Sequence, residues 1–367
     1  MKLSSLANRH ALKALAAFGP LLVLGCGSTD GNSDPGVESA GQASSFPAGH
    51  ADPCKTKLHT GYANDELCLA PPPADLGFQL HFGPTDYSDP DSVKPYILKP
   101  SGEEVVCENF TTPNTTDQYY FEYHARLREG THHMITYASE TNPTTPPDGT
   151  LGPCNLDPSF HFIFGSQAAL GKEGGVLDVP LPGKNAVAPE NAGLAAKLLA
   201  KTKAVVEMHY VNTSEEDILR EGWINVLYTP ASEVKGIIDP IFFIGGLSMN
   251  VPPHSQQLVK VAGCGLSDAQ PDPLRILGIT GHSHASTTRV SAYIDRANGD
   301  HQLVYETYNW QEPINAEYDS VHTNHPPGDG KTDGALSGDL TISRGETFSW
   351  ECQVDNQLDT SLRFANE

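Results

Sequence analysis

The chain has 367 residues, of which 45 are acidic and 23 are basic, and its formal net charge at pH 7 is −22. A protein of this charge repels the phosphates of nucleic acid, so we expect no nucleic-acid partner. Beyond residue 70 the chain is long enough for two domains of ordinary size, each with its own hydrophobic core.

The first 25 residues have the pattern of an export signal. Three basic residues precede an apolar run, Ala14 to Leu24, that is too short to span a membrane. The run ends in Val23-Leu24-Gly25-Cys26, which resembles a bacterial lipobox, where cleavage falls before the cysteine and its thiol receives a lipid. We therefore expect a lipoprotein signal peptide over residues 1–25 and lipidation of Cys26, with a buried apolar helix as the alternative.

These features predict an extracytoplasmic protein of the cell envelope, on the periplasmic or outer-membrane face, that meets the membrane through its lipid anchor only. The segment that follows, from Gly27 to about Ala51, is rich in Gly, Ser, Asp and Pro and is typical of a flexible tether. We assign residues 26–70 to this tether together with the segment that carries Cys54 and Cys68.

With Cys26 assigned to the lipid, six of the seven cysteines remain, an even number. In an oxidising compartment this predicts a disulfide framework. None of the six falls in a C-x-x-C pair, which disfavours a cysteine-rich zinc or redox motif. The six are Cys54, Cys68, Cys107, Cys154, Cys264 and Cys352.

Short β-rich runs recur between turn signals along the rest of the chain, and this spacing favours β-sandwiches or barrels, so the predicted fold class is all-β. A short helix, or only a turn of helix before the strand that carries His209, is expected within Pro189–Lys203, where Ala and Leu crowd between charged residues. A boundary near Thr229–Pro240 divides the remainder into domains at 71–232 and 233–367. The expected strands include residues 78–82, 134–137, 204–210, 223–228, 257–261 and 289–294.

Three histidine signatures occur in strand-like contexts. Imidazole is the commonest protein ligand for copper and zinc, and it binds in its neutral form. Fifteen histidines give about one close pair by chance, but three signatures indicate a protein that holds metal in two places. They are Thr131-His132-His133-Met134, Glu207-Met208-His209-Tyr210 and Gly281-His282-Ser283-His284.

Strand geometry constrains how these imidazoles meet. His282 and His284 lie on the same face of a strand, because side chains alternate with period two. His132 and His133 point to opposite faces of a regular strand, so sharing a metal requires a bend, which Gly130 makes feasible, or ligation through different ring nitrogens. His209 comes from a distant strand and completes a three-histidine site only in the folded state.

The order of the three signatures resembles the copper type II, ascorbate-dependent monooxygenases. The likeness runs from about Pro71 to the end of the chain and includes residues 130–134 and Trp350-Glu351-Cys352. The resemblance implies two tandem jelly-roll β-sandwich domains that face each other across a cleft, with one copper site in each and two coppers in a complete member. It also implies hydroxylation of a C–H bond of a small organic substrate with O2 and an electron donor such as ascorbate.

The resemblance assigns a role to each histidine. His132, His133 and His209 correspond to the ligands of the electron-storing copper. His282 and His284 correspond to the ligands of the oxygen-activating copper, and they are the predicted catalytic residues.

The chain departs from the family pattern at its end. The family's oxygen-activating copper takes a methionine from a Glu-Met-Cys motif downstream of the segment that matches Trp350-Glu351-Cys352, and none of the four methionines here matches it. We therefore expect the domain at 233–367 to be incomplete, with His322 or His325 as an alternative ligand. By the same resemblance Cys107 pairs with Cys154 and Cys54 with Cys68, while Cys264 and Cys352 are unpaired or bonded to each other.

Two further positions bear on the activity. Peptide-amidating members hold a substrate carboxylate with an arginine where this chain has Thr280, so a glycine-extended peptide is not the expected substrate. Glu207 stands where the family often has glutamine. The alternatives to a monooxygenase are a non-catalytic copper-binding envelope lipoprotein, and a zinc hydrolase with Glu207 as base that leaves His282 and His284 without a role.

Overall fold

The structure is a computed structural model that describes residues 21–26, 58, 60–139, 141, 143–154, 160–167, 174–244, 249–268, 270–310 and 313–363. Strands account for 48% and helices for 6% of the chain, which confirms the all-β prediction. Most of the expected signal peptide and tether, including Cys54, lies outside the described residues. The helical elements are α1 (Pro90–Val93) and the 3-10 turns η1 (Asp65–Leu67), η2 (Lys94–Tyr96), η3 (Pro189–Asn191) and η4 (Ala231–Glu233).

The first half of the chain forms two sheets that enclose one hydrophobic core. One sheet has the order β14-β10-β5-β13-β2, with β9 also paired to β5, and the other has the order β7-β4-β11-β6-β8. A small pair, β3-β12, lies beside them. The strands are β2 (Gly77–Phe82), β3 (Ile97–Leu98), β4 (Glu103–Thr111), β5 (Gln118–Leu127), β6 (Thr131–Ser139), β7 (Leu151–Gly152), β8 (Phe160–Gln167), β9 (Gly175–Pro180), β10 (Leu194–Leu198), β11 (Lys203–Val211), β12 (Ile218–Leu219), β13 (Gly222–Thr229) and β14 (Gly236–Ile237).

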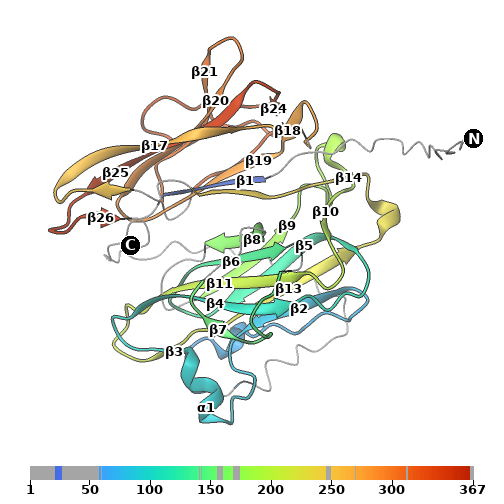
Figure 1. Cartoon of the computed structure of the whole chain (residues 1–367), viewed down its shortest axis with the longest axis vertical. Coiled ribbons are helices and arrows are strands. Elements are labelled where there is room, and N and C mark those ends of the chain that lie inside the picture. Colours follow the sequence, from blue (N-terminus) through green and yellow to red (C-terminus); the bar gives the residue numbers. More distant parts are fainter. Residues whose placement is uncertain are drawn as a thin grey trace, which may run out of the picture.

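The second half forms its own sheets around a separate core (Figure 1). Its main sheets have the orders β17-β25-β20-β21-β23 and β15-β1-β19-β22, and β18-β24 and β16-β26 are short pairs. The strands are β15 (Ile241–Ile244), β16 (Asn250–Val251), β17 (Ser255–Gly265), β18 (Leu274–Ile276), β19 (Gly278–Ser283), β20 (Thr287–Asp295), β21 (His301–Thr307), β22 (Asn315–Glu317), β23 (Gly334–Ala335), β24 (Leu340–Ile342), β25 (Thr347–Asn356) and β26 (Leu362–Arg363).

Side-chain alternation in the central strands of the first half separates core from site. On β11, Val206, Met208 and Tyr210 are fully buried and belong to the first-half core. Glu207 and His209 alternate with them and so point to the other face of the sheet. β6 repeats the pattern, because Met134 pairs with Met208 and His133 pairs with His209. The outer face of this sheet therefore carries His133, Glu207 and His209, and the second half lies over it (Figure 1).

The end of the expected signal peptide has a place in this fold. Leu21–Cys26 forms β1, which lies parallel to β15 on one side and to β19 on the other (blue in Figure 1). These residues are therefore a strand and not the buried helix of the alternative interpretation. Cleavage before Cys26 would remove five of the six residues of β1. Among the described residues no helix is both long and apolar enough to cross a membrane.

Of the two forms expected within Pro189–Lys203, a short helix or a single helical turn, the structure has the turn. Only η3 is helical, and Leu194–Leu198 is β10, which pairs with β5 and β14. Leu194, Ala195, Ala196 and Leu198 are all at most 3% exposed. Burial between two strands therefore outweighs the weak helix preference of the Ala-rich sequence. Because β14 joins the first-half sheet, that half extends to Ile237.

The cysteines follow the predicted framework in part. Cys107 and Cys154 form a disulfide, as expected. Cys68 is also disulfide-bonded, and its expected partner Cys54 lies outside the described residues. Cys264 is a free, exposed thiol, as one of the two expectations for it has it. Cys352 is disulfide-bonded, so the expectation that it is unpaired or bonded to Cys264 is wrong.

Candidate metal centre

A β-bulge brings His132 and His133 to the same site. In the pairing of β6 with β11, His209 is opposite His133 and Tyr210 is opposite Thr131, which leaves His132 as the extra residue. Such an extra residue bends the strand and re-aims its side chain. The turn before it needs Gly130, which has φ +79° and whose added Cβ would lie 2.4 Å from Cδ1 of Ile218. The bulge supplies the bend that the sequence required.

The three imidazoles of the first half converge through the same ring atom. Nδ1 of His132 lies 3.2 Å from Nδ1 of His133 and 3.2 Å from Nδ1 of His209. All three side chains are buried, with exposures of 2%, 8% and 3%. Ligation through different nitrogens is therefore unnecessary, and the three rings present one group of three Nδ1 atoms.

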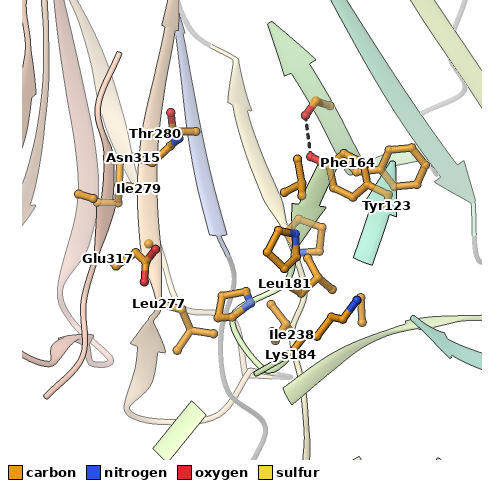
Figure 2. A pocket seen from close by; sticks show the side chains of 18 of the residues that line it. Tyr123, Phe164, Leu181, Lys184, Ile238, Leu277, Ile279, Thr280, Asn315 and Glu317 are labelled. Atoms are coloured by element: carbon orange, nitrogen blue, oxygen red, sulfur yellow. Dashed lines mark hydrogen bonds between the residues drawn. The ribbon is translucent and has the colours of Figure 1, made fainter. Parts of the chain in front are cut away.

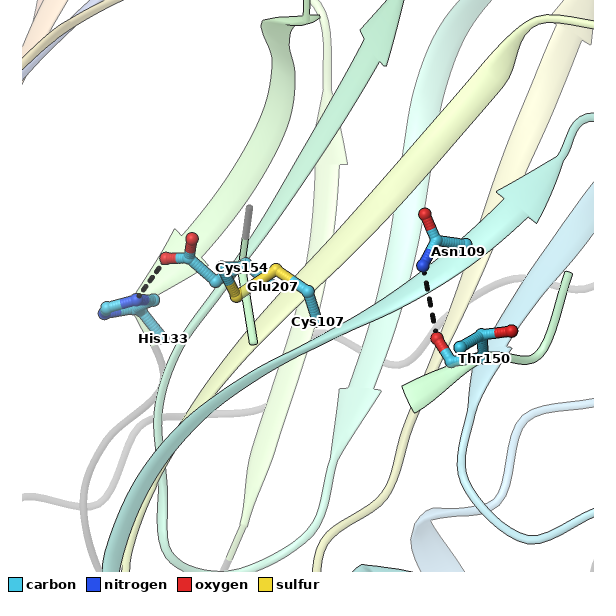
Figure 3. Close-up of a disulfide and its surroundings, with 6 residues drawn as sticks. All are labelled: Cys107, Asn109, His133, Thr150, Cys154 and Glu207. Atoms are coloured by element: carbon cyan, nitrogen blue, oxygen red, sulfur yellow. Dashed lines mark hydrogen bonds and ion pairs between the residues drawn. A yellow bond between two sulfur atoms is a disulfide. The ribbon is translucent and has the colours of Figure 1, made fainter. Parts of the chain in front are cut away.

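Carboxylates lie behind two of these rings. Nε2 of His133 is 3.2 Å from Oε1 of Glu207, and Nε2 of His209 is 2.9 Å from Oε1 of Glu103 (Glu207 in Figure 3). The Cys107–Cys154 disulfide lies next to Glu207 in the same view, with its sulfur atoms within 4.8 Å of the carboxylate. Each carboxylate accepts a hydrogen bond from Nε2, so the lone pair of each ring is on Nδ1.

The histidines of the second half join the same cluster. His282 is on β19, which ends at Ser283, and His284 lies just beyond the end of the strand. The centroids of their rings are 5.2 Å apart. The ring centroids of His284 and His132 are 4.4 Å apart, and those of His282 and His133 are 5.1 Å apart. Nitrogen atoms of these four histidines all lie within 4.8 Å of one another. The structure thus brings together two ligand sets that we expected to face each other across a cleft.

Burial favours the uncharged form of His132, His133, His282 and His284. Desolvation, reinforced by the neighbouring imidazoles, lowers the pKa of His132 far below its usual value and lowers the pKa of His282 and His284 in the same way. Burial also lowers the pKa of His133, against the opposing effect of Glu207. Neutral imidazoles can pack closely without charge repulsion, and the neutral form is the one that binds a metal ion.

This donor set fits a copper or zinc ion. Two lone pairs, on Nδ1 of His133 and of His209, point at Nδ1 of His132, which carries at most one proton and can donate to only one of them. A cation among the three Nδ1 atoms would relieve the repulsion between the lone pairs that receive no proton. The 3.2 Å distances from Nδ1 of His132 to the other two Nδ1 atoms agree with a bound cation. Ligand nitrogens at about 2.0–2.1 Å from a tetrahedral ion lie roughly 3.3 Å apart.

A cavity of about 780 Å³ opens beside the cluster, between the two halves. His133 and His282 line it together with many apolar side chains from both halves. Figure 2 shows Phe164, Leu181 and Ile238 on one side of this space and Leu277 and Ile279 on the other. Thr280 lines the cavity as well, and no arginine is among the described residues that line it. The space suits a mainly apolar small molecule that reaches the histidines.

The remaining candidates for the missing ligand lie elsewhere. Nδ1 of His322 is 2.8 Å from Oδ2 of Asp319 and 3.2 Å from Oε2 of Glu317, so it belongs to a separate acidic group. His325 is exposed. Met134 and Met208 are buried in the first-half core, and Met249 is buried in a small cluster with Val251.

Sequence reasoning did not find Glu103, which sits behind His209. β4 pairs with β11, and Glu103 is opposite Val211, two residues beyond His209 on the same face. That pairing cannot be read from a single sequence, because the partner of β11 at this edge is set by the fold.

No protein-family model matches this sequence, and no curated protein matches it either. The functional assignment therefore depends on the side chains and their geometry.

Proposed function

We propose that the protein is a copper-dependent monooxygenase that hydroxylates a C–H bond of a small organic substrate with O2 and a one-electron donor such as ascorbate. The observation that carries this proposal is the convergence of five histidines from both halves beside an apolar cavity. A single structural metal needs only four ligands. Five imidazoles next to a substrate-sized space suit a redox site better.

The proposal gives each ligand set a role. His132, His133 and His209 hold the electron-storing copper, and His282 and His284 hold the catalytic copper. The metal supplies the one-electron and oxygen chemistry when it is bound. The chain supplies neutral ligands in a fixed geometry, and the contact between the rings of His132 and His284 gives a short path between the two sets.

The cavity supports the choice of a small, mainly apolar substrate. Its lining lacks, among the described residues, the arginine that would hold a peptide carboxylate by a guanidinium fork. The single lysine in the lining, Lys184, is already paired with Glu122. A substrate with a free carboxylate therefore finds no unpaired cationic side chain here, and we propose an uncharged or cationic substrate.

The finer architecture is part of the same proposal. We propose that each half is one jelly-roll domain that contributes one copper site. Two separate hydrophobic cores support this division. The close approach of the two ligand sets means that the halves of this protein come together at the metal sites instead of leaving an open cleft between them.

Two other functions make different predictions. A non-catalytic copper protein would bind copper but would not consume O2 with ascorbate. A zinc hydrolase would use Glu207 as a base on metal-bound water. Glu207 lies at Nε2 of His133, on the side of the ring away from Nδ1, so it is turned away from the point where a metal would lie. This observation counts against the hydrolase.

The test is copper stoichiometry and ascorbate-dependent O2 consumption. We expect two coppers in the chain from Gly27, and the loss of at least one when His132 and His133 are both changed to alanine. O2 consumption should require both copper and the donor. Copper binding without O2 consumption over a broad set of small organic substrates would favour the non-catalytic alternative. Tight binding of zinc with no copper would contradict the proposal.

A further inference from the structure

Two of the three converging imidazoles are supported by a carboxylate, and the two carboxylates come from different strands. Glu207 is on β11 and contacts Nε2 of His133 on β6, while Glu103 at the start of β4 contacts Nε2 of His209 on β11. Each contact therefore crosses from one strand to its neighbour. Three adjacent strands of one sheet are tied together at the metal-facing histidines.

Glu207 is itself held in place. Tyr137 is buried beside this carboxylate, and burial together with the charge of Glu207 raises the pKa of Tyr137. The Cys107–Cys154 disulfide lies within 4.8 Å of the same carboxylate. The side chain of Glu207 is 16% exposed, whereas that of Glu103 is 38% exposed. Water screens the charge of Glu103 more than that of Glu207, so Glu207 acts on the site more strongly.

We propose that Glu207 and Glu103 are positioning residues that hold Nδ1 of His133 and His209 toward the metal and bias the bound copper toward Cu(II). This inference rests on the proposed function. A hydrogen bond from Nε2 to a carboxylate fixes the tautomer and makes the opposite nitrogen a stronger donor. Two negative charges behind the ligands also stabilise the more highly charged ion. The site is therefore a strong electron donor once it has been reduced.

The charge and the hydrogen bond can be separated by the choice of substitution. Glu207→Gln keeps an oxygen that accepts the hydrogen bond from Nε2 of His133 but removes the negative charge. Glu207→Ala removes both. Glu103→Gln tests the second carboxylate in the same way. Glu216→Gln is the matched control, because it makes the same change of net charge at an exposed position.

The measurements are Cu(II) and Cu(I) affinities by chelator competition, and the reduction potential of the bound copper. We expect Glu207→Gln to weaken Cu(II) binding by about 10-fold or more, within the range for residues that support metal ligands, and to change Cu(I) binding much less. A tenfold loss for Cu(II) alone corresponds to a rise of about 59 mV for a one-electron couple. Glu103→Gln should shift the potential in the same direction by less, and Glu216→Gln should leave it unchanged.

The outcomes separate this inference from the proposed function. If the unsubstituted chain binds no copper, the proposed function fails. If it binds copper and Glu207→Gln leaves both affinities and the potential unchanged, the proposed function stands and the role of the carboxylates is overturned. Glu207→Ala should weaken binding of both oxidation states, because His133 then loses its orienting partner. Far-UV circular dichroism and an intact Cys107–Cys154 disulfide establish that each variant is folded.

Discussion

The two sides of the histidine cluster are built differently. The first-half side, His132, His133 and His209, lies on the central strands β6 and β11, with carboxylates behind two of its rings. The second-half side, His282 and His284, lies at the end of β19, between β1 and the three-residue strand β22. The first side is fixed by long pairings and cross-strand hydrogen bonds, while the second depends on the short strand β22 and on β1, which lies at the end of the predicted signal peptide.

This difference predicts which of the two histidine sets binds metal more tightly. A preorganised ligand set loses little on binding, because its side chains are already ordered. The first-half side meets this condition, with three Nδ1 atoms already spaced as metal ligands. We therefore expect the first-half site to bind copper more tightly, and the second-half site to depend on how well β19 is held.

The largest expected effect compares one histidine from each side. His209→Ala should weaken the tighter copper site by at least about 100-fold, because the change removes a ligand from the preorganised set. His284→Ala should leave that site within a few-fold of the unsubstituted chain. Stoichiometry and affinity by chelator competition measure both. Equal losses in the two variants would mean that the five histidines form one indivisible site.

The second comparison concerns β1, which the sequence predicts to be the end of a signal peptide and which belongs to the second-half sheet in the structure. We expect the intact mass of the protein from the membrane fraction to begin at a lipidated Cys26. The position between β15 and β19 is then largely vacated in the mature protein. A mature mass that retains residues 1–25 would contradict the lipoprotein prediction and would make β1 a permanent strand beside the second histidine pair.

The first-half side also has a buried ion pair beneath it. Arg128 and Glu221 are both fully buried, with Nε of Arg128 2.7 Å from Oε2 of Glu221. Arg128 begins the turn that leads to His132, and its carbonyl accepts a hydrogen bond from Oγ1 of Thr131. The hydroxyl of Tyr210, next to His209, donates to the carbonyl of Glu221.

Glu221→Gln should lower the free energy of unfolding by roughly 3–5 kcal/mol, because it leaves a buried guanidinium without its closest charged partner. Chemical denaturation measures this. Copper binding to the first-half site should weaken as well, since the Arg128–Glu221 pair anchors both strands that carry His132, His133 and His209. Asp217→Asn, which breaks the exposed pair with Lys99, is the control and should change stability by less than about 1 kcal/mol.

The opposite face of the same sheet offers a third test. Glu108 on β4 faces the core, is 3% exposed, and has only Tyr96 as a side-chain partner at 3.2 Å. Burial raises the pKa of Glu108 to about 7 from an ordinary value of 4.5, against the smaller opposing effect of Tyr96. The folded state therefore binds the proton more tightly than the unfolded chain does.

The sign follows from this linkage. The stabilising effect of the protonated Glu108 is complete below pH 4.5 and is lost as the pH rises through about 7. Across that window the shift corresponds to about 3 kcal/mol. Glu108→Gln should remove most of this pH dependence, and denaturation at pH 5 and pH 8 measures it. If the unsubstituted protein and the Glu108→Gln variant lose the same stability between pH 5 and pH 8, Glu108 is not the group responsible.

Much of the fold was predictable because burial leaves a local pattern. Residues 204–210, which we expected to form a strand, alternate between the core and the outer face, and all of them lie within β11. The Ala-rich segment at 194–198 misled the prediction, because its strand form depends on pairing with β5 and β14, which are distant in sequence. Local propensity cannot report that context.

The site shows the same division. All five histidines were identified from their signatures, and the need for a bend at His132 followed from strand alternation. The bulge that supplies it depends on the register against β11, and the carboxylate of Glu103 reaches His209 through the pairing of β4. The joining of the two histidine sets depends on how two separately folded sheets meet. The bulge, the Glu103 contact and the joining of the two sets cannot be predicted from a local stretch of sequence.

The smallest expected effect concerns the support of the second side. The hydroxyl of Tyr305, which is fully buried, accepts the backbone N–H of Gly281 at 2.8 Å and donates to the carbonyl of Ile314 at 2.8 Å. Gly281 directly precedes His282, so this hydroxyl anchors β19 at the histidine. Tyr305→Phe leaves both backbone groups unsatisfied and should lower stability by about 1–3 kcal/mol.

Tyr318→Phe is a matched control, because it removes a buried hydroxyl of the same core that donates to the carbonyl of Val304 and not to a residue of β19. Both variants should lose stability in thermal unfolding, but only Tyr305→Phe should weaken copper binding at the second-half site. If the two variants bind copper equally well, the position of His282 does not depend on this anchor. The weaker side would then be held by its strand neighbours alone, and the contrast between the two sides would come from strand pairing and not from side-chain hydrogen bonds.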